Sequence, residues 1–180
     1  SHVLFAPHSL SSLIGFFDNG LDEVGLVHGP LLMDDLNNVA THFSDVWSDG
    51  MWGQWKTDQR WQSESYFDIH AQGMGAFACR KENWLRFCDE NRGFGGEEVT
   101  IHELFRKNNR PVRCLSSFLW NHRFRFGGEK IPYPNRHEDR VKNYLREFKR
   151  LDRGPQEVID HFKSVGVREE EILRWQSELG

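Results

Sequence analysis

The stretch Gly93-Phe94-Gly95-Gly96-Glu97-Glu98 is the most informative part of the sequence, because it joins a glycine-rich turn to two adjacent carboxylates. Glycines let the backbone turn tightly and approach a ligand closely. Apolar residues at helical spacing follow it, which predicts an amphipathic helix that ends near Asn108-Asn109. Acids are favoured at the first turn of a helix, so one interpretation is a simple helix start. The other is a general base beside a hydroxyl-binding acid, and composition does not choose between them.

Short strands are expected to alternate with helices around this stretch, and a helical tail is expected over residues 136–179. The predicted elements are a helix over 9–19 capped by Ser9, a strand over 26–33 interrupted by Gly29-Pro30, a glycine-rich strand over 73–79, a short helix over 81–88, a strand over 113–118, and helices over 136–153, 155–165 and 169–179. This order is typical of the α/β class with helices appended.

The composition argues against several functional classes. With 23 basic and 27 acidic side chains the net charge is −4, which disfavours a nucleic-acid binder held by phosphate contacts. No apolar run approaches the ~20 residues of a membrane span, and no signal peptide is visible at the start. Cys79, Cys88 and Cys114 lack zinc-type spacing and cannot all pair with one another. Reduced thiols, and a cytoplasmic or membrane-peripheral location, are therefore expected.

Residues 41–66 differ in character from the rest of the chain. They hold Trp47, Trp52, Trp55 and Trp61 amid glycine and polar residues. One hypothesis is an ordered loop filled by aromatic rings. The other is a mobile lid whose rings stack on a ligand.

Three segments, in order, resemble the C-terminal half of a GT-A-type glycosyltransferase. Residues 73–80, Gly-Met-Gly-Ala-Phe-Ala-Cys-Arg, are similar to the glycine-rich strand that these enzymes place under the donor sugar and acceptor. Residues 93–98 resemble the W-G-G-E-N element of polypeptide N-acetylgalactosaminyltransferases and the W-G-G-E-D element of β-1,4-galactosyltransferases, with Phe94 in place of Trp. Residues 120–124, Trp-Asn-His-Arg-Phe, lie where such enzymes carry a late metal-binding His.

The resemblance covers about residues 1–134 and implies a partial GT-A (nucleotide-diphospho-sugar transferase, Rossmann-like) fold, with a helical extension over 135–180. Ser1-His2-Val3-Leu4-Phe5 is similar to the end of a D-S-H-V-L-F segment whose Asp would lie upstream. The resemblance then implies a fragment or split subunit, with the nucleotide base held by an N-terminal half or parent chain. The alternative is that Ser1-His2 is a tag scar.

The resemblance also implies roles for single residues. His2 and His122 would ligate Mn²⁺ or Mg²⁺, which neutralises the diphosphate leaving group. Glu97 would bind a sugar hydroxyl, and Glu98 would be the base of an inverting transfer. Further donor and acceptor contacts would come from Gly73, Met74, Gly75, Phe94, Gly95, Gly96, from Trp52 and Trp55 in a loop that closes over the donor, and from Arg123 at the diphosphate. For Arg123, exposure to solvent is an equal alternative.

The implied function is a metal-dependent glycosyltransferase acting on a UDP- or GDP-linked sugar and on a glycan, lipid-linked or protein hydroxyl. The alternative is a non-catalytic glycan-binding or scaffolding half of a GT-A-like protein. A metal-dependent hydrolase is disfavoured, because the sequence contains no H-x-E-x-x-H or H-x-H-x-D cluster.

Overall fold

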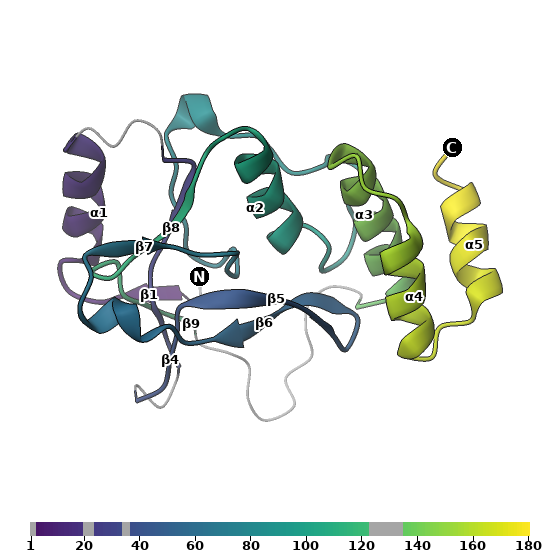
Figure 1. Cartoon of the computed structure of the whole chain (residues 1–180), viewed down its shortest axis with the longest axis horizontal. Helices are drawn as coiled ribbons and strands as arrows, with labels where there is room; N and C mark the ends of the chain where they lie inside the picture. The colour runs from purple at the N-terminus through teal and green to yellow at the C-terminus, as the bar shows by residue number, and fades with distance from the viewer. Residues whose placement is uncertain (1–2, 20–23, 34–36, 123–134) are drawn as a thin grey trace.

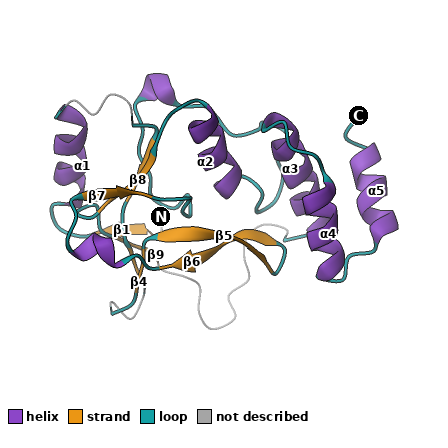
Figure 2. Cartoon of the chain, in the orientation of Figure 1, coloured by secondary structure: helices purple, strands orange, loops and turns teal. Residues whose placement is uncertain are grey.

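The computed structural model describes residues 3–19, 24–33, 37–122 and 135–180. This part of the chain is mixed α/β, with helices α1 to α5 and strands arranged in three small sheets (Figures 1 and 2). The predicted α/β class is therefore confirmed.

Two of the sheets contain both parallel and antiparallel pairs. The first has the order β1 (Val3–Phe5), β9 (Trp120–His122), β3 (Leu31–Leu32), β4 (Val39–Ala40), and the second has the order β2 (Leu26–His28), β8 (Val112–Leu115), β7 (Tyr66–Asp68). The parallel pairs are β3–β9 and β2–β8. The predicted break at Gly29-Pro30 separates β2 from β3. A Cβ on Gly29 would lie 1.6 Å from the Phe118 carbonyl oxygen, so a side chain there has no room.

The tryptophan-rich segment forms a hairpin, β5 (His42–Ser48) and β6 (Met51–Lys56). Asp49 and Gly50 join the strands with φ of 50° and 75°, as a two-residue type I′ turn requires. Trp52 is 1% exposed and belongs to the core. The expected loop is therefore a hairpin, and the Trp52 ring, which was expected to contact the donor, is buried in the core instead.

Residues 73–79 do not form the predicted strand, and in this described segment only Ala78 makes a β-bridge, to Val27. The backbone here fits against two large rings instead. A Cβ on Gly73 would lie 3.0 Å from the Trp55 ring, and one on Gly75 would lie 2.8 Å from the Trp120 ring. Close packing on indoles, rather than pairing in a sheet, explains why both positions are glycine.

Two smaller expectations also need correction. The helix predicted over 81–88 is only a single 3₁₀ turn, Lys81–Asn83, followed by irregular backbone. Ser9 does not cap helix α1 (Ser9–Asp18). Its hydroxyl donates to the Leu119 carbonyl oxygen at 2.7 Å, which ties the start of α1 to the first sheet.

The remaining helices lie where the sequence predicts them. They are α2 (Glu98–Lys107), α3 (His137–Arg150), α4 (Gln156–Ser164) and α5 (Glu169–Ser177), with a further 3₁₀ turn over Gln59–Gln62. Among the described residues, no helix is long and apolar enough to cross a membrane.

Helices α3 and α4 pack against the turn end of the hairpin, and α5 packs against α3 and α4 (Figure 1). Trp52 shares one buried cluster with Tyr144, Phe148, Phe162 and Ile172. The apolar stripe of α3 therefore packs into the core. The boundary expected between residues 134 and 135 stays a prediction.

Candidate functional site

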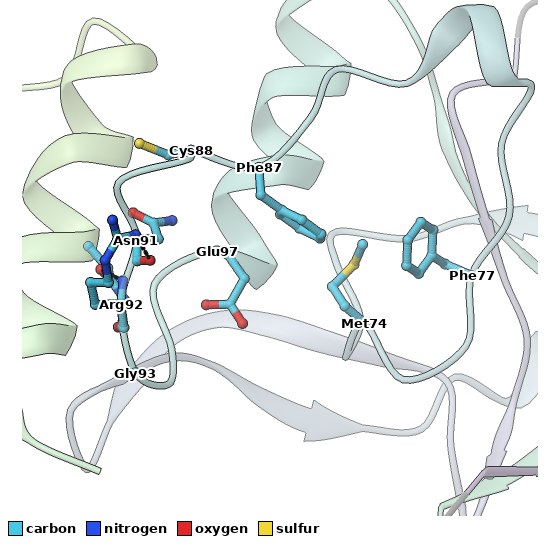
Figure 3. Close-up of a pocket in the computed structure, with 9 residues that line it drawn as sticks. Met74, Phe77, Phe87, Cys88, Asn91, Arg92, Gly93 and Glu97 are labelled. Carbon is cyan, nitrogen blue, oxygen red and sulfur yellow. Dashed lines mark hydrogen bonds between the residues drawn. The ribbon is translucent and has the colours of Figure 1, made fainter. Parts of the chain in front are cut away.

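A pocket of about 350 Å³ opens beside the start of α2 (Figure 3). One wall is apolar and the other polar, and the lining residues are Met74, Phe77, Phe87, Cys88, Asn91, Arg92, Gly93, Glu97 and Asn143. Figure 3 shows the Glu97 carboxylate pointing into the space between Met74 and the loop at Gly93. Apolar walls with a few placed polar groups, at this size, are typical of small-molecule sites.

The loop of residues 88–96, here called the site loop, is held by the polar side of α3. Asn143 is 2% exposed. Its amide nitrogen donates to the carbonyl oxygens of Arg92 and Gly95 at 2.7 and 2.8 Å, and its oxygen accepts from the Arg92 N–H at 2.9 Å. One turn further on, Glu147 accepts from the Cys88 N–H and the Asn91 amide.

Three glycines of the site loop have positive φ: 65° at Gly93, 89° at Gly95 and 103° at Gly96. Residues with a Cβ rarely adopt this conformation. A Cβ on Gly96 would also lie 2.6 Å from the Asn143 Cβ. The glycines thus let the chain turn against α3 and deliver Glu97 to the pocket.

Burial shapes the electrostatics of the two glutamates. It raises the pKa of Glu97, with the Glu147 charge adding to the rise and the Arg140 cation opposing it. Burial, followed by the charge of Glu97, raises the pKa of Glu98 to about 8, again against Arg140. Glu98 is the first residue of α2 and is not among the pocket-lining residues.

A pair of buried imidazoles joins α2 to β2 behind these glutamates. The Gln72 N–H donates to His102 Nε2, which therefore carries no proton, and His102 Nδ1 donates to the Glu98 carbonyl oxygen. His28 Nε2 lies 2.8 Å from His102 Nε2. Burial lowers the pKa of His28 to about 3 and that of His102 well below its ordinary value, so both rings are neutral.

The turn at residues 73–75 connects several of the predicted site residues. Gly73 contacts the Trp55 ring, Met74 lines the pocket, and a Cβ on Gly75 would lie 3.4 Å from the His122 ring. The structure therefore brings Trp55, Glu97 and His122 to one short segment of backbone, although they are far apart in sequence.

Other predicted site residues lie apart from the pocket. The Phe94 ring lies 5.8 Å from the Arg140 guanidinium, and Gly95 and Gly96 pack on α3. The buried Trp52 ring donates its N–H to Asp45 at 2.7 Å and is not among the residues that line this pocket.

The proposed metal ligands are only partly covered by the structure. His122 ends β9 and pairs with Val3 of β1. His2 and Arg123 lie outside the described residues. Among the described residues, no three His, Cys, Asp or Glu side chains are grouped so that they could hold a metal ion.

Sequence reasoning missed the residues of α3 that carry the site loop. Arg140, Asn143 and Glu147 lie at i, i+3 and i+7, which places them on one side of a helix, and all three are buried. The available signal was that a polar stripe at this spacing borders the apolar stripe. Sequence reasoning also gave no site role to Phe77, which lies within the quoted segment 73–80, or to Phe87, which lies between the two quoted motifs.

A scan against protein-family models and a search of curated proteins found no match to this chain.

Proposed function

We propose that this chain forms the sugar- and acceptor-binding part of a metal-dependent glycosyltransferase of GT-A type. The observation that carries the proposal is the turn at residues 73–75, which lies between the pocket containing Glu97 and the His122 ring. These are three of the segments that the sequence resemblance relates to one active site.

The pocket has the surfaces that a sugar ring needs. Met74, Phe77 and Phe87 provide an apolar wall for the C–H face of a pyranose, and Glu97 provides a carboxylate for its hydroxyls. Asn91 and Arg92 add donors at the rim. We assign the sugar-hydroxyl contact to Glu97.

We assign the general base of an inverting transfer to Glu98. With a pKa of about 8, the Glu98 carboxylate is a stronger base than an ordinary glutamate. At pH 7, however, only about a tenth of the molecules have Glu98 ionised. The rate of transfer should therefore increase with pH and level off above about 8. The donor would be UDP- or GDP-linked, and the acceptor a glycan, lipid-linked or protein hydroxyl.

Among the described residues, we assign His122 as a ligand of Mn²⁺ or Mg²⁺, because both ions accept imidazole ligands. His2 would be the second ligand, and the residue that follows it, Val3, is the strand partner of His122. When bound, such an ion would neutralise the diphosphate of the donor.

The test separates binding from transfer. Calorimetry on this chain with monosaccharides, and with UDP or GDP in the presence of Mn²⁺, would be combined with a transfer assay on the full-length parent protein carrying Glu97→Gln, Glu98→Gln or the exposed control Glu64→Gln. We expect Glu97→Gln to weaken sugar binding, Glu98→Gln to retain binding and lose transfer, and Glu64→Gln to match the wild type. A folded wild-type chain that binds neither sugar nor nucleotide would refute the proposal.

One observation favours the second candidate, a non-catalytic glycan-binding half of a GT-A-like protein. Of the two glutamates, Glu97 alone is among the residues that line the pocket. For this candidate Glu97→Gln weakens sugar binding as before. Glu98→Gln matches Glu64→Gln, and no donor supports transfer in the wild type.

A further inference from the structure

Arg140 is a buried cation whose hydrogen-bond partners come from two distant segments. Its side chain belongs to a residue only 6% exposed. Nε donates to the Phe94 carbonyl oxygen, and Nη1 donates to the carbonyl oxygens of Asp49 and Gly50, each at 3.4 Å. Nη2 donates to Asn135. Burying a charge costs free energy, so the burial of the Arg140 guanidinium needs an explanation.

The two segments are the tip of the β5–β6 hairpin and the site loop. Both have a glycine where the guanidinium passes. A Cβ on Gly50 would lie 3.0 Å from Nη1, and one on Gly95 would lie 3.1 Å from Nε. A Cβ on Gly95 would also lie 2.9 Å from the Met51 sulfur, so the hairpin and the site loop are in direct contact. Arg140 therefore occupies a gap that both segments leave open.

Besides bridging the two segments, the Arg140 guanidinium affects the ionisation of Glu97 and Glu98. The charge of Glu97 raises the pKa of Glu98, and Glu147 of α3 adds a further negative charge near Glu97. Arg140, from the same helix, is the cation that favours their ionised forms. The Tyr144 hydroxyl of the same helix accepts a hydrogen bond from the backbone N–H of Trp52 at 2.7 Å.

We infer that Arg140 is a positioning residue, which locks the hairpin tip at Asp49-Gly50 to the site loop at Phe94-Gly95 and so fixes the turn that delivers Glu97 to the pocket. The bridge itself rests on the contacts above. Its consequence for transfer rests on the proposed function.

The bridge requires the shape of arginine as well as its charge. A guanidinium is a rigid fork whose donors diverge, whereas a lysine ammonium is a compact charge on a flexible stem. Lysine at position 140 should keep the cation near the carboxylates but should not reach both segments at once. The two effects of Arg140 can therefore be measured separately.

The experiment compares Arg140→Gln and Arg140→Lys with Lys149→Gln, an exposed control on the same helix that also loses one positive charge. Amide hydrogen exchange reports the order of the site loop, and carbon-detected NMR reports the titration of Glu97 and Glu98. We expect both Arg140 variants to lose at least tenfold in protection over residues 93–98. Carboxyl titration should move to higher pH in Arg140→Gln and return toward the wild-type position in Arg140→Lys, a rescue that a merely structural role would not produce.

Wild-type-like protection and titration in Arg140→Gln, matching Lys149→Gln, would overturn the inference. If Arg140→Gln does not fold, Arg140→Lys and the wild-type Nε–H signal decide. A slowly exchanging signal supports the bridge, and one that exchanges as fast as free arginine refutes it. None of these readouts needs a sugar or nucleotide, so failure of the proposed function would be seen separately, as a folded chain with an ordered site loop that binds neither.

Discussion

Asn143 offers the sharpest test of how the site loop is held. Replacing it with alanine removes three hydrogen bonds to backbone groups of Arg92 and Gly95. Each such bond contributes about 1 kcal/mol net, and the partners are left in a place that water reaches poorly. We therefore expect Asn143→Ala to lower the free energy of unfolding by about 3 kcal/mol. For a chain of this size that corresponds to a fall in melting temperature of roughly 6–12 °C.

The assay is urea unfolding followed by tryptophan fluorescence, with Asn108→Ala as the matched control. Asn108 ends α2, and its amide makes an exposed hydrogen bond to the Leu104 carbonyl oxygen at 2.8 Å. Its removal should cost no more than about 1 kcal/mol. If the two variants lose equal stability, the site loop is not held by Asn143 and the reasoning fails. An Asn143→Ala chain that keeps its full affinity for a pocket ligand would contradict the link between the clamp and the pocket.

Two further predictions concern packing and pH. Gly96→Ala should destabilise the chain by about 3 kcal/mol, because the position combines a φ of 103° with no room for a Cβ; Gly15→Ala in α1, where a Cβ meets nothing within 4 Å, should instead stabilise it by about 0.5–1 kcal/mol. Thermal melts of the two variants should therefore shift in opposite directions. The neutral His28–His102 pair has depressed pKa values in the folded state, so its contribution to stability is complete above the ordinary pKa of about 6.5 and falls as the pH drops below it. Each ring lowers the free energy of unfolding by up to about 1.4 kcal/mol for each pH unit of acidification. Denaturant unfolding at several pH values between 7 and 4 should show a weaker dependence of this free energy on pH in His28→Gln than in the wild type. An equal pH dependence would contradict the assignment of neutral rings.

The sequence predicts the helices well because their signals are local. The apolar stripes of α2 to α5 are visible within each segment, and the structure has helices at all of those places. The hairpin was missed, although Asp49-Gly50 is a strong signal for a type I′ turn. Abundant glycine and polar residues around the tryptophans suggested a loop. The burial of Trp52 is not a local property, because the ring packs with Tyr144 and Phe148 of α3, which come about ninety residues later in the chain.

The candidate site was predictable in its residue types but not in its supports. The Gly93–Glu98 motif does place a carboxylate at a pocket, and that carboxylate is Glu97. Residues 73–79 read as a strand, because nothing local reveals that Trp55 and Trp120 press on the two glycines. Nothing local marks Arg140 and Asn143 as supports of the site, because the loop that they bind lies about fifty residues earlier in the chain.

The parallel pairs β2–β8 and β3–β9 have a consequence for how the protein is made. Leu26 pairs with Val112, and Leu31 pairs with Trp120, so each early strand waits for a partner some 90 residues later. At a synthesis rate of ~5–20 residues per second, both early strands emerge from the ribosome on the order of ten seconds before their partners. During that interval their apolar residues have no sheet to join. Expression at lower temperature or with added chaperone should therefore improve the soluble yield of this chain.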